Sequence, residues 1–137
     1  MRNIIKKHEH FLMSDDMPLA RSPYFLIRMR PARIPGDPQY GLTVTKKTLR
    51  HAVDRNRAKR LLREWIRFNE KWMRNDRDYV FIARRAILDA DRTTGRTAIK
   101  MALRFLKRLP NNATREMCMG DRDRPATTAD TTDKNNE

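Results

Sequence analysis

One segment of the chain, residues 51–69, presents two opposite faces at the spacing of an α-helix. Its apolar residues recur three and four positions apart, in a stripe that can pack on a sheet: Ala58, Leu61, Leu62, Trp65 and Ile66. The opposite side carries Asn56, Lys59, Arg60, Arg63 and Arg67, with Arg55 and Arg57 at its borders. The pattern predicts a long amphipathic helix whose outer face is cationic.

This cationic face is nearly of one sign, because Glu64 at its margin is the only acid nearby. Like charges four residues apart destabilise a helix by a few tenths of a kcal/mol per pair, so a merely solvated face more often mixes signs. Arginine binds phosphate through two donors at once, and Asn56 can bond a base edge or a 2′-hydroxyl, or equally the backbone at the helix start. We interpret the face as a nucleic-acid-binding surface that Lys46 and Lys47 extend.

The overall charge supports a polyanionic partner. The 137 residues include 31 Lys and Arg against 17 Asp and Glu, a net charge of +14. Nucleic acid is favoured over an anionic membrane, because the sequence has no long apolar run and no signal-peptide-like start. Cys118 is the only cysteine, so we expect no intrachain disulfide and a reducing, cytoplasmic location.

The chain divides by composition near residue 110. Residues 110–137 have almost no large apolar side chains and carry 4 Lys and Arg against 6 Asp and Glu, so we expect a disordered tail. The basic charge therefore belongs to residues 1–109, which we expect to form one folded nucleic-acid-binding domain.

The remaining elements suggest a sheet covered by helices. Residues 24–30 alternate like a strand, with Phe25, Ile27 and Met29 on one face and Tyr24, Leu26 and Arg28 on the other. Further strands are predicted over residues 40–45 and 78–84, and further helices over residues 3–13 and 94–109. This order predicts a small α+β (α/β sandwich) domain with one layer of helices on a sheet.

Catalytic and metal-binding patterns do not stand out. His8, His10 and His51 lack the spacing of a zinc site, and no nucleophile–base order or glycine-rich phosphate loop is present. A basic zipper would need leucine heptads after the basic run, and a helix-turn-helix would need a helix just before it. The sequence has neither of these features.

Three segments together resemble the bacterial ribonuclease P protein family. They are residues 41–47 (GLTVTKK), residues 55–64 (RNRAKRLLRE), preceded at the family spacing by Ala52, and residues 78–84 (DYVFIAR). With the N-terminal segment that carries Phe11, the similarity spans residues 5–108.

The resemblance implies a ribosomal-protein-like fold of αβββαβα order with a left-handed βαβ crossover. It also implies a function: the protein subunit of the ribonuclease P endoribonuclease, which removes the 5′ leader from precursor tRNA. The partners would be the catalytic RNA, bound 1:1, and precursor tRNA, with no membrane and no obligate protein partner. No catalytic or metal-binding residue would lie in the protein, and Mg²⁺ would be held chiefly by the RNA.

The family's two RNA-binding surfaces carry over by position. The surface for the catalytic RNA would comprise Lys46, Lys47, Arg55, Asn56, Arg57, Lys59, Arg60 and Arg63, to which the helical pattern adds Arg67. The leader-binding cleft would comprise Phe11, Tyr24, Leu26 and Arg28. Three positions depart from the family pattern: Asp15 and Arg28 stand where an aromatic is common, and Thr48-Leu49-Arg50 where a glycine is common.

Two other classes of function remain open from the residues. One is a ribosomal or RNA-chaperone protein that uses the same basic helix. The other is a protein-only nuclease whose scattered carboxylates hold Mg²⁺: Asp15, Asp16, Asp37, Asp54 and Glu64. Cleavage of precursor tRNA only when the chain is mixed with a ribonuclease P RNA would select the ribonuclease P subunit over both of these classes.

Overall fold

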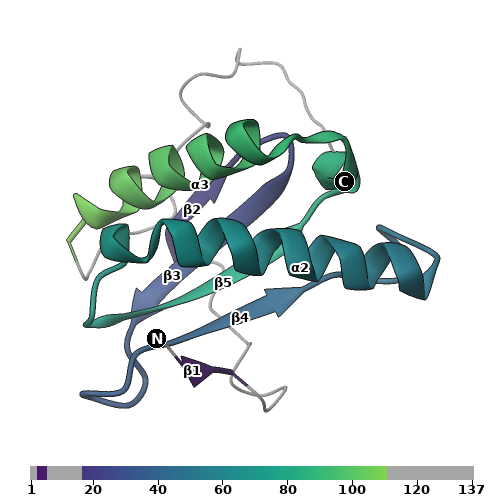
Figure 1. Cartoon of the computed structure of the whole chain (residues 1–137). Helices are drawn as coiled ribbons and strands as arrows, with labels where there is room; N and C mark the ends of the chain where they lie inside the picture. Colours follow the sequence, from purple (N-terminus) through teal and green to yellow (C-terminus); the bar gives the residue numbers. More distant parts are fainter. Residues whose placement is uncertain (1–2, 6–16, 111–137) are drawn as a thin grey trace, which may run out of the picture.

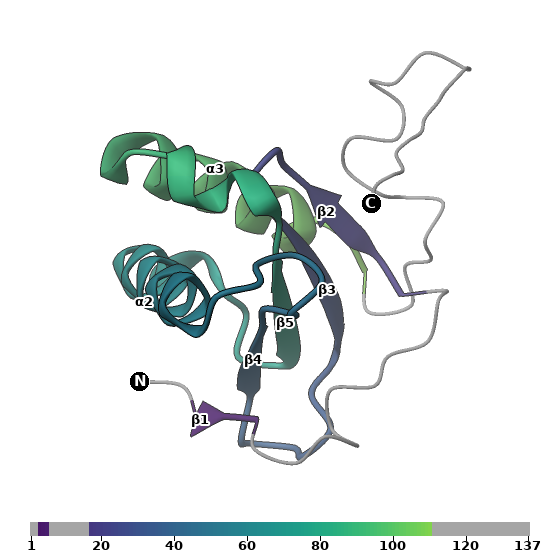
Figure 2. The same cartoon turned by 90° about the vertical axis from the view of Figure 1, so that its right-hand side faces the viewer.

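The computed structural model describes residues 3–5 and 17–110 of the chain. Five strands form one mixed sheet in the spatial order β1-β4-β5-β3-β2. Two helices, α2 (Ala52–Phe68) and α3 (Arg92–Lys107), lie side by side on one face of this sheet (Figures 1 and 2). The prediction of a small α+β domain with one helical layer is confirmed.

The strands are β1 (Asn3–Ile4), β2 (Leu19–Arg21), β3 (Phe25–Pro31), β4 (Gln39–Thr43) and β5 (Arg77–Ala83). The central strand β5 is antiparallel to β3 and parallel to β4, so β4, α2 and β5 form a βαβ unit. Two short 3-10 helices, η1 (Glu70–Trp72) and η2 (Arg85–Asp89), flank β5 along the chain. Three predicted strands and two predicted helices begin and end within two residues of β3, β4, α2, β5 and α3.

The predicted N-terminal helix over residues 3–13 is wrong at its start. Asn3–Ile4 instead form β1, which pairs in parallel with β4, and the Ile5 amide donates to the Tyr40 carbonyl at 2.8 Å. The β-branched side chains of Ile4 and Ile5 suit a strand better than a helix. Residues 6–13 lie outside the described residues, as does the predicted tail except for Pro110.

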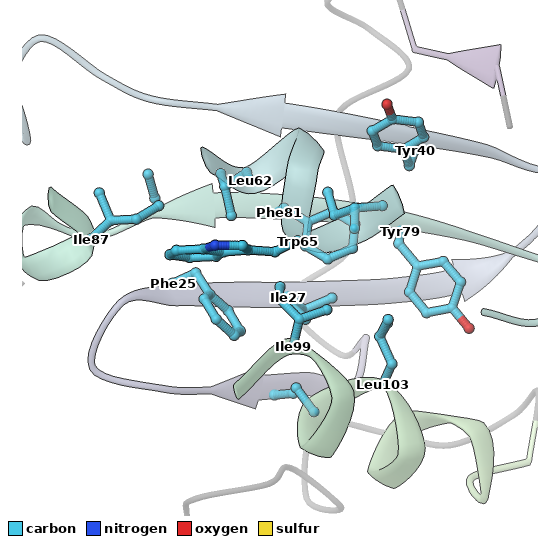
Figure 3. Packing of buried hydrophobic residues seen from close by; sticks show 14 of the residues in the cluster. Phe25, Ile27, Tyr40, Leu62, Trp65, Tyr79, Phe81, Ile87, Ile99 and Leu103 are labelled. Carbon is cyan, nitrogen blue, oxygen red and sulfur yellow. The ribbon is translucent and has the colours of Figure 1, made fainter. Parts of the chain in front are cut away.

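The core lies between the sheet and the helical layer (Figure 3). One of the two predicted faces of β3, with Phe25, Ile27 and Met29, is fully buried there. The predicted apolar stripe of α2 meets it: Ala58, Leu62, Trp65 and Ile66 are buried, and Leu61 is half-buried against the cluster. From α3 come Ile99, Ala102, Leu103 and Leu106, all of them buried.

The two helices are in close contact where Trp65 of α2 meets Gly95 of α3. The indole is fully buried, and a Cβ atom on Gly95 would overlap its Cδ2, Cε2 and Cζ2 atoms. Any side chain at residue 95 would therefore push the helices apart. Gly95 lies in the first turn of α3, and Asp91 caps the start of this helix. The Asp91 carboxylate accepts a hydrogen bond from the Thr94 amide at 2.7 Å, and this bond lowers the pKa of Asp91.

Buried polar groups hold the helical layer in place. Asn69, just after α2, donates from its side-chain amide to the Arg96 carbonyl of α3 at 2.9 Å. The guanidinium of Arg77 on β5 is buried and donates to the carbonyls of Leu106, at 2.6 Å, and Leu109. Burial lowers the pKa of Arg77, and these carbonyls satisfy donors that would otherwise be costly to bury. The end of α3 is thereby tied to the sheet.

Substitution of Gly95 tests the close approach of the helices. Gly95→Ala should lower the free energy of unfolding by about 1–3 kcal/mol through overpacking, even though alanine is the better helix former by about 1 kcal/mol. Urea denaturation measures the difference. Thr97→Ala, at an exposed position of the same helix, is the control and should change stability by less than about 0.5 kcal/mol.

A double variant checks the mechanism. If the indole is the obstacle, Gly95→Ala should cost less in a Trp65→Leu background than in the wild type, because the smaller side chain leaves room for the new methyl group. Equal costs in both backgrounds would show that the contact between Trp65 and Gly95 does not set the helix spacing.

Candidate nucleic-acid interface

The polar side of α2 is exposed on the outside of the helical layer. Asn56, Arg57, Arg60, Arg63 and Arg67 are exposed and Lys59 is half-buried; we call these six residues the α2 cationic face. All of them except Lys59, which borders the buried stripe, lie opposite that stripe on the same helix, as the 3.6-residue period requires. Eight of the nine residues predicted for the catalytic-RNA surface, Arg55 excepted, are therefore on or beside one exposed area, with Lys46 and Lys47 exposed in the turn before α2.

Arg55 has a different position from the other predicted residues. Its guanidinium turns back below the start of α2 and donates to the carbonyls of Leu49, at 2.9 Å, and Arg50, at 2.7 Å. His51, at the N-cap position, provides no side-chain cap for α2. Arg55 therefore stabilises the turn that leads into the helix and so positions the cationic residues on both sides of it.

A hollow of about 350 Å³ opens beside the second half of the α2 cationic face. It is lined by Arg60, Arg63, Glu64, Arg67 and Phe68 of α2 and by Arg96 of α3. The Phe68 side chain is 57% exposed, and the Arg96 guanidinium carbon lies 4.0 Å from its ring centroid, a cation–π contact. The hollow thus combines an accessible aromatic ring with several guanidinium groups.

Glu64, the one acid lining this hollow, is already engaged by α3. Its Oε2 atom lies 2.7 Å from Arg96 Nη2, and its Oε1 atom lies 3.9 Å from Arg92 Nε. Arg60, Arg63 and Arg67 therefore keep their charge available along the rim. Guanidinium groups in this arrangement can bind phosphates through two donors, and an exposed ring can stack on a base.

The residues predicted for the leader-binding cleft are in another part of the domain. Leu26 and Arg28 alternate with the buried residues of β3, so they point to the sheet face opposite the helices, where both are half-buried. Tyr24 lies in the turn before β3 and is half-buried against the core cluster. Phe11 and Asp15 lie outside the described residues.

Carboxylates do not gather into a metal site within residues 3–5 and 17–110. No three His, Cys, Asp or Glu side chains come together there. Glu64 is paired with arginines, and Asp37 accepts from the Gln39 side chain at 3.4 Å. Asp15 and Asp16 lie outside the described residues. Nor is any helix in this part of the chain long and apolar enough to cross a membrane.

The contribution of Phe68, Arg92 and Arg96 to this surface was not predicted from the sequence. Phe68 follows Arg67 at the end of α2 and is exposed, while Trp65 and Ile66 are buried. The position of Phe68, beyond the end of the apolar stripe, is the feature of the sequence that could have indicated an exposed aromatic ring. The two arginines belong to α3, so only the packing of the two helices brings Arg96 to the hollow and Arg92 to within 3.9 Å of Glu64.

Sequence comparisons with known proteins all point to one family. The family model for ribonuclease P matches residues 2–107. The ribonuclease P protein component of Pasteurella multocida is 38% identical over 100 residues, which are 72% of this chain and 82% of that protein. The corresponding component of Photorhabdus laumondii is 34% identical over 91 residues, 66% of this chain and 74% of that protein.

Solved structures show the same fold. The Staphylococcus aureus RNase P protein superposes with a TM-score of 0.63 at 22% sequence identity, over 78% of this chain and 97% of that one. The RNase P protein from Thermotoga maritima gives a TM-score of 0.62 at 23% identity, over 75% of this chain and 96% of that one.

The position of Arg55 leads to a prediction about stability. Arg55→Gln should lower the free energy of unfolding by about 1 kcal/mol or more, because two hydrogen bonds from a charged group to backbone carbonyls are lost. Arg57→Gln removes the same charge two residues later without such bonds and should leave stability within about 0.5 kcal/mol. Thermal or urea unfolding of the two variants measures the difference, and equal stability would show that Arg55 does not support the turn.

Proposed function

The chain belongs to the ribonuclease P protein family, and we propose that it binds the catalytic RNA through the α2 cationic face. It is a component of the ribonuclease P endoribonuclease and takes part with the catalytic RNA in the 5′ maturation of precursor tRNA. Membership of the family establishes this role, while the arrangement of charge on the helices supports the α2 cationic face as the RNA-binding surface.

The observation that carries the proposal is the uncompensated charge beside the hollow. Arg60, Arg63 and Arg67 recur along one side of α2, and Glu64, the acid that lines the hollow with them, is ion-paired with Arg96 of α3. Neighbouring like charges on a helix repel one another, and a phosphate backbone laid along them would relieve this repulsion and release counterions. Phe68 would add a ring on which an unpaired base can stack.

We assign the chemistry of cleavage to the RNA. Hydrolysis of a phosphodiester in this enzyme family calls for Mg²⁺, which we expect the catalytic RNA to hold, because the described part of the chain offers no cluster of ligands for it. The protein's share would then be binding, orientation and the screening of phosphate repulsion.

The sheet face opposite the helices is our candidate for the 5′ leader of precursor tRNA. Leu26 and Arg28 offer an apolar side chain and a guanidinium there, and Phe11 stays a predicted stacking residue. With the catalytic RNA on the helical side, one protein would bridge both RNAs. We therefore expect a 1:1 complex without an obligate protein partner, located in the cytoplasm.

We also infer that the β4-α2-β5 crossover is left-handed. Figure 1 views the sheet from the side of the helices, and Figure 2 shows that both helices are on this side. When the view is turned so that the parallel strands β4 and β5 point upward, β5 lies to the left of β4. Such crossovers are rare, so this handedness supports a specific relation to the family.

Removal of two charges tests the role of α2. The Arg60→Gln, Arg63→Gln double variant should bind the catalytic RNA more weakly, and the slope of log affinity against log salt should flatten by about two units, one per lost phosphate contact. Filter binding between 50 and 200 mM salt, in the range where counterion release is measurable, gives both quantities.

A matched control removes two exposed cations elsewhere. The Arg33→Gln, Arg85→Gln variant has the same net charge and should retain the wild-type slope. Wild-type affinity and slope in a folded Arg60→Gln, Arg63→Gln protein would exclude the α2 cationic face from the RNA interface.

The leader surface has its own test. In the reconstituted holoenzyme, Arg28→Gln should weaken binding of precursor tRNA by about tenfold or more, the value of one charge-assisted hydrogen bond, and leave mature tRNA unaffected. Arg85→Gln is the single-charge control. An equal loss for both tRNAs, or no loss for either, would count against leader binding on this face.

A further inference from the structure

α3 carries a second row of cations that the α2 surface does not include. Its members are spaced four, four, four and three residues apart: Arg92, Arg96, Lys100, Arg104 and Lys107. The helix contains no acidic residue. Steps of four residues place neighbouring side chains on one side of a helix, about 6 Å apart along its axis. We call this row the α3 stripe.

The second half of the stripe surrounds a single tryptophan ring. Arg104 Cζ lies 5.1 Å from the Trp72 ring centroid, and the ammonium nitrogens of Lys100 and Lys107 lie 5.6 and 5.7 Å from it. Lys71, next to Trp72 in η1, adds a fourth cation at 5.5 Å. We call these five residues the Trp72 cluster. One half-buried indole thus holds four positive charges in close proximity.

The two halves of the stripe differ in how their charge is balanced. Arg92 and Arg96 lie 3.9 and 2.7 Å from carboxylate oxygens of Glu64. Lys100, Arg104, Lys107 and Lys71 form no ion pair with any acid among residues 3–5 and 17–110. The indole face attracts each cation but carries no net charge, so it cannot cancel their mutual repulsion. An external anion with several negative charges would cancel this repulsion.

The α3 stripe is continuous with the α2 cationic face. Arg96 lies over Phe68 and lines the hollow beside Arg67, and η1 follows directly after α2. The Asn69 side chain fixes this junction by its bond to the Arg96 carbonyl. In Figures 1 and 2 both helices cover the same sheet face, so a polyanion on α2 can extend onto α3 without crossing the sheet.

We propose that the Trp72 cluster binds a second stretch of the phosphate backbone of the catalytic RNA. The proposal rests on the function proposed for α2, because continuity with that face selects the catalytic RNA over precursor tRNA as the partner. Regular spacing of the cations suits a phosphate strand, and Trp72 keeps the four side chains in one place before the RNA arrives. The interface then spans both helices.

A charge-neutral variant of the cluster tests the proposal. Lys100→Gln, Arg104→Gln removes two exposed charges, and Arg33→Gln, Arg85→Gln is the matched control. Binding to the catalytic RNA and to precursor tRNA is titrated separately between 50 and 200 mM salt. Loss of two phosphate contacts should flatten the salt slope for the catalytic RNA by about two units, so that fourfold more salt costs the variant about tenfold less affinity than it costs the wild type.

A second variant separates the effect of the Trp72 ring from the effect of the surrounding charges. Trp72→Leu keeps all four cations and should weaken binding to the catalytic RNA severalfold while the salt slope stays within one unit of the wild type. Melting temperatures confirm that both variants are folded. Supporting results are a flattened slope in the Gln variant together with reduced affinity in the Leu variant.

Three outcomes would overturn the proposal. If the cluster variants bind like the wild type while the Arg60→Gln, Arg63→Gln protein is weakened, the Trp72 cluster is not an RNA contact and the proposed function of α2 stands. If all of these variants bind like the wild type, both proposals fail. A loss confined to precursor tRNA would assign the cluster to the other RNA.

Discussion

The packing of Trp65 against Gly95 sets the geometry on which both cationic surfaces depend. The indole is buried among side chains of the sheet and the helices, and the absence of a side chain at residue 95 lets α3 approach it. This contact fixes the spacing of the helices, so that Glu64 meets Arg96 and Arg96 meets Phe68. An apolar contact inside the protein thereby decides how positive charge is distributed on its surface.

Polar contacts then stabilise an arrangement that charge repulsion opposes. Buried Asp78 accepts hydrogen bonds from Arg30 and from the backbone amides of Arg33 and Gln39, and so joins β5 to the loop between β3 and β4. Arg77, next along β5, binds carbonyls at the end of α3. These bonds hold the sheet and the helices together, while the side chains of Arg60, Arg63 and Arg67 form no hydrogen bond or ion pair within residues 3–5 and 17–110. Their arrangement is better explained by binding of RNA than by stability.

Much of the fold could be predicted because two periods are visible in the sequence. The 3.6-residue period of residues 51–69 separates Leu62 and Trp65 from Arg60 and Arg63, and the alternation of residues 24–30 separates Ile27 from Arg28. The strand Asn3–Ile4 is too short to show a period, and it forms only because β4 offers an open edge. The long α2 helix was therefore predicted well and the short β1 strand was not.

The parts of the site that escaped prediction arise from contacts between distant segments. Arg55 belongs to the basic motif, but only the folded turn reveals that its guanidinium binds the carbonyls of Leu49 and Arg50. Phe68 and Arg96 meet only after the helices have packed. Local patterns thus identified the charged face, whereas its shape depends on tertiary structure.

The central claim is that the catalytic RNA covers the helical side of the domain. Residue-by-residue chemical modification of arginine and lysine, read by mass spectrometry with and without the catalytic RNA, measures this directly. We expect the RNA to protect Arg60, Arg63, Arg67, Lys100 and Arg104, while Arg33 and Arg85 stay equally reactive in both samples. Unchanged reactivity along α2 and α3, with protection elsewhere, would contradict the account.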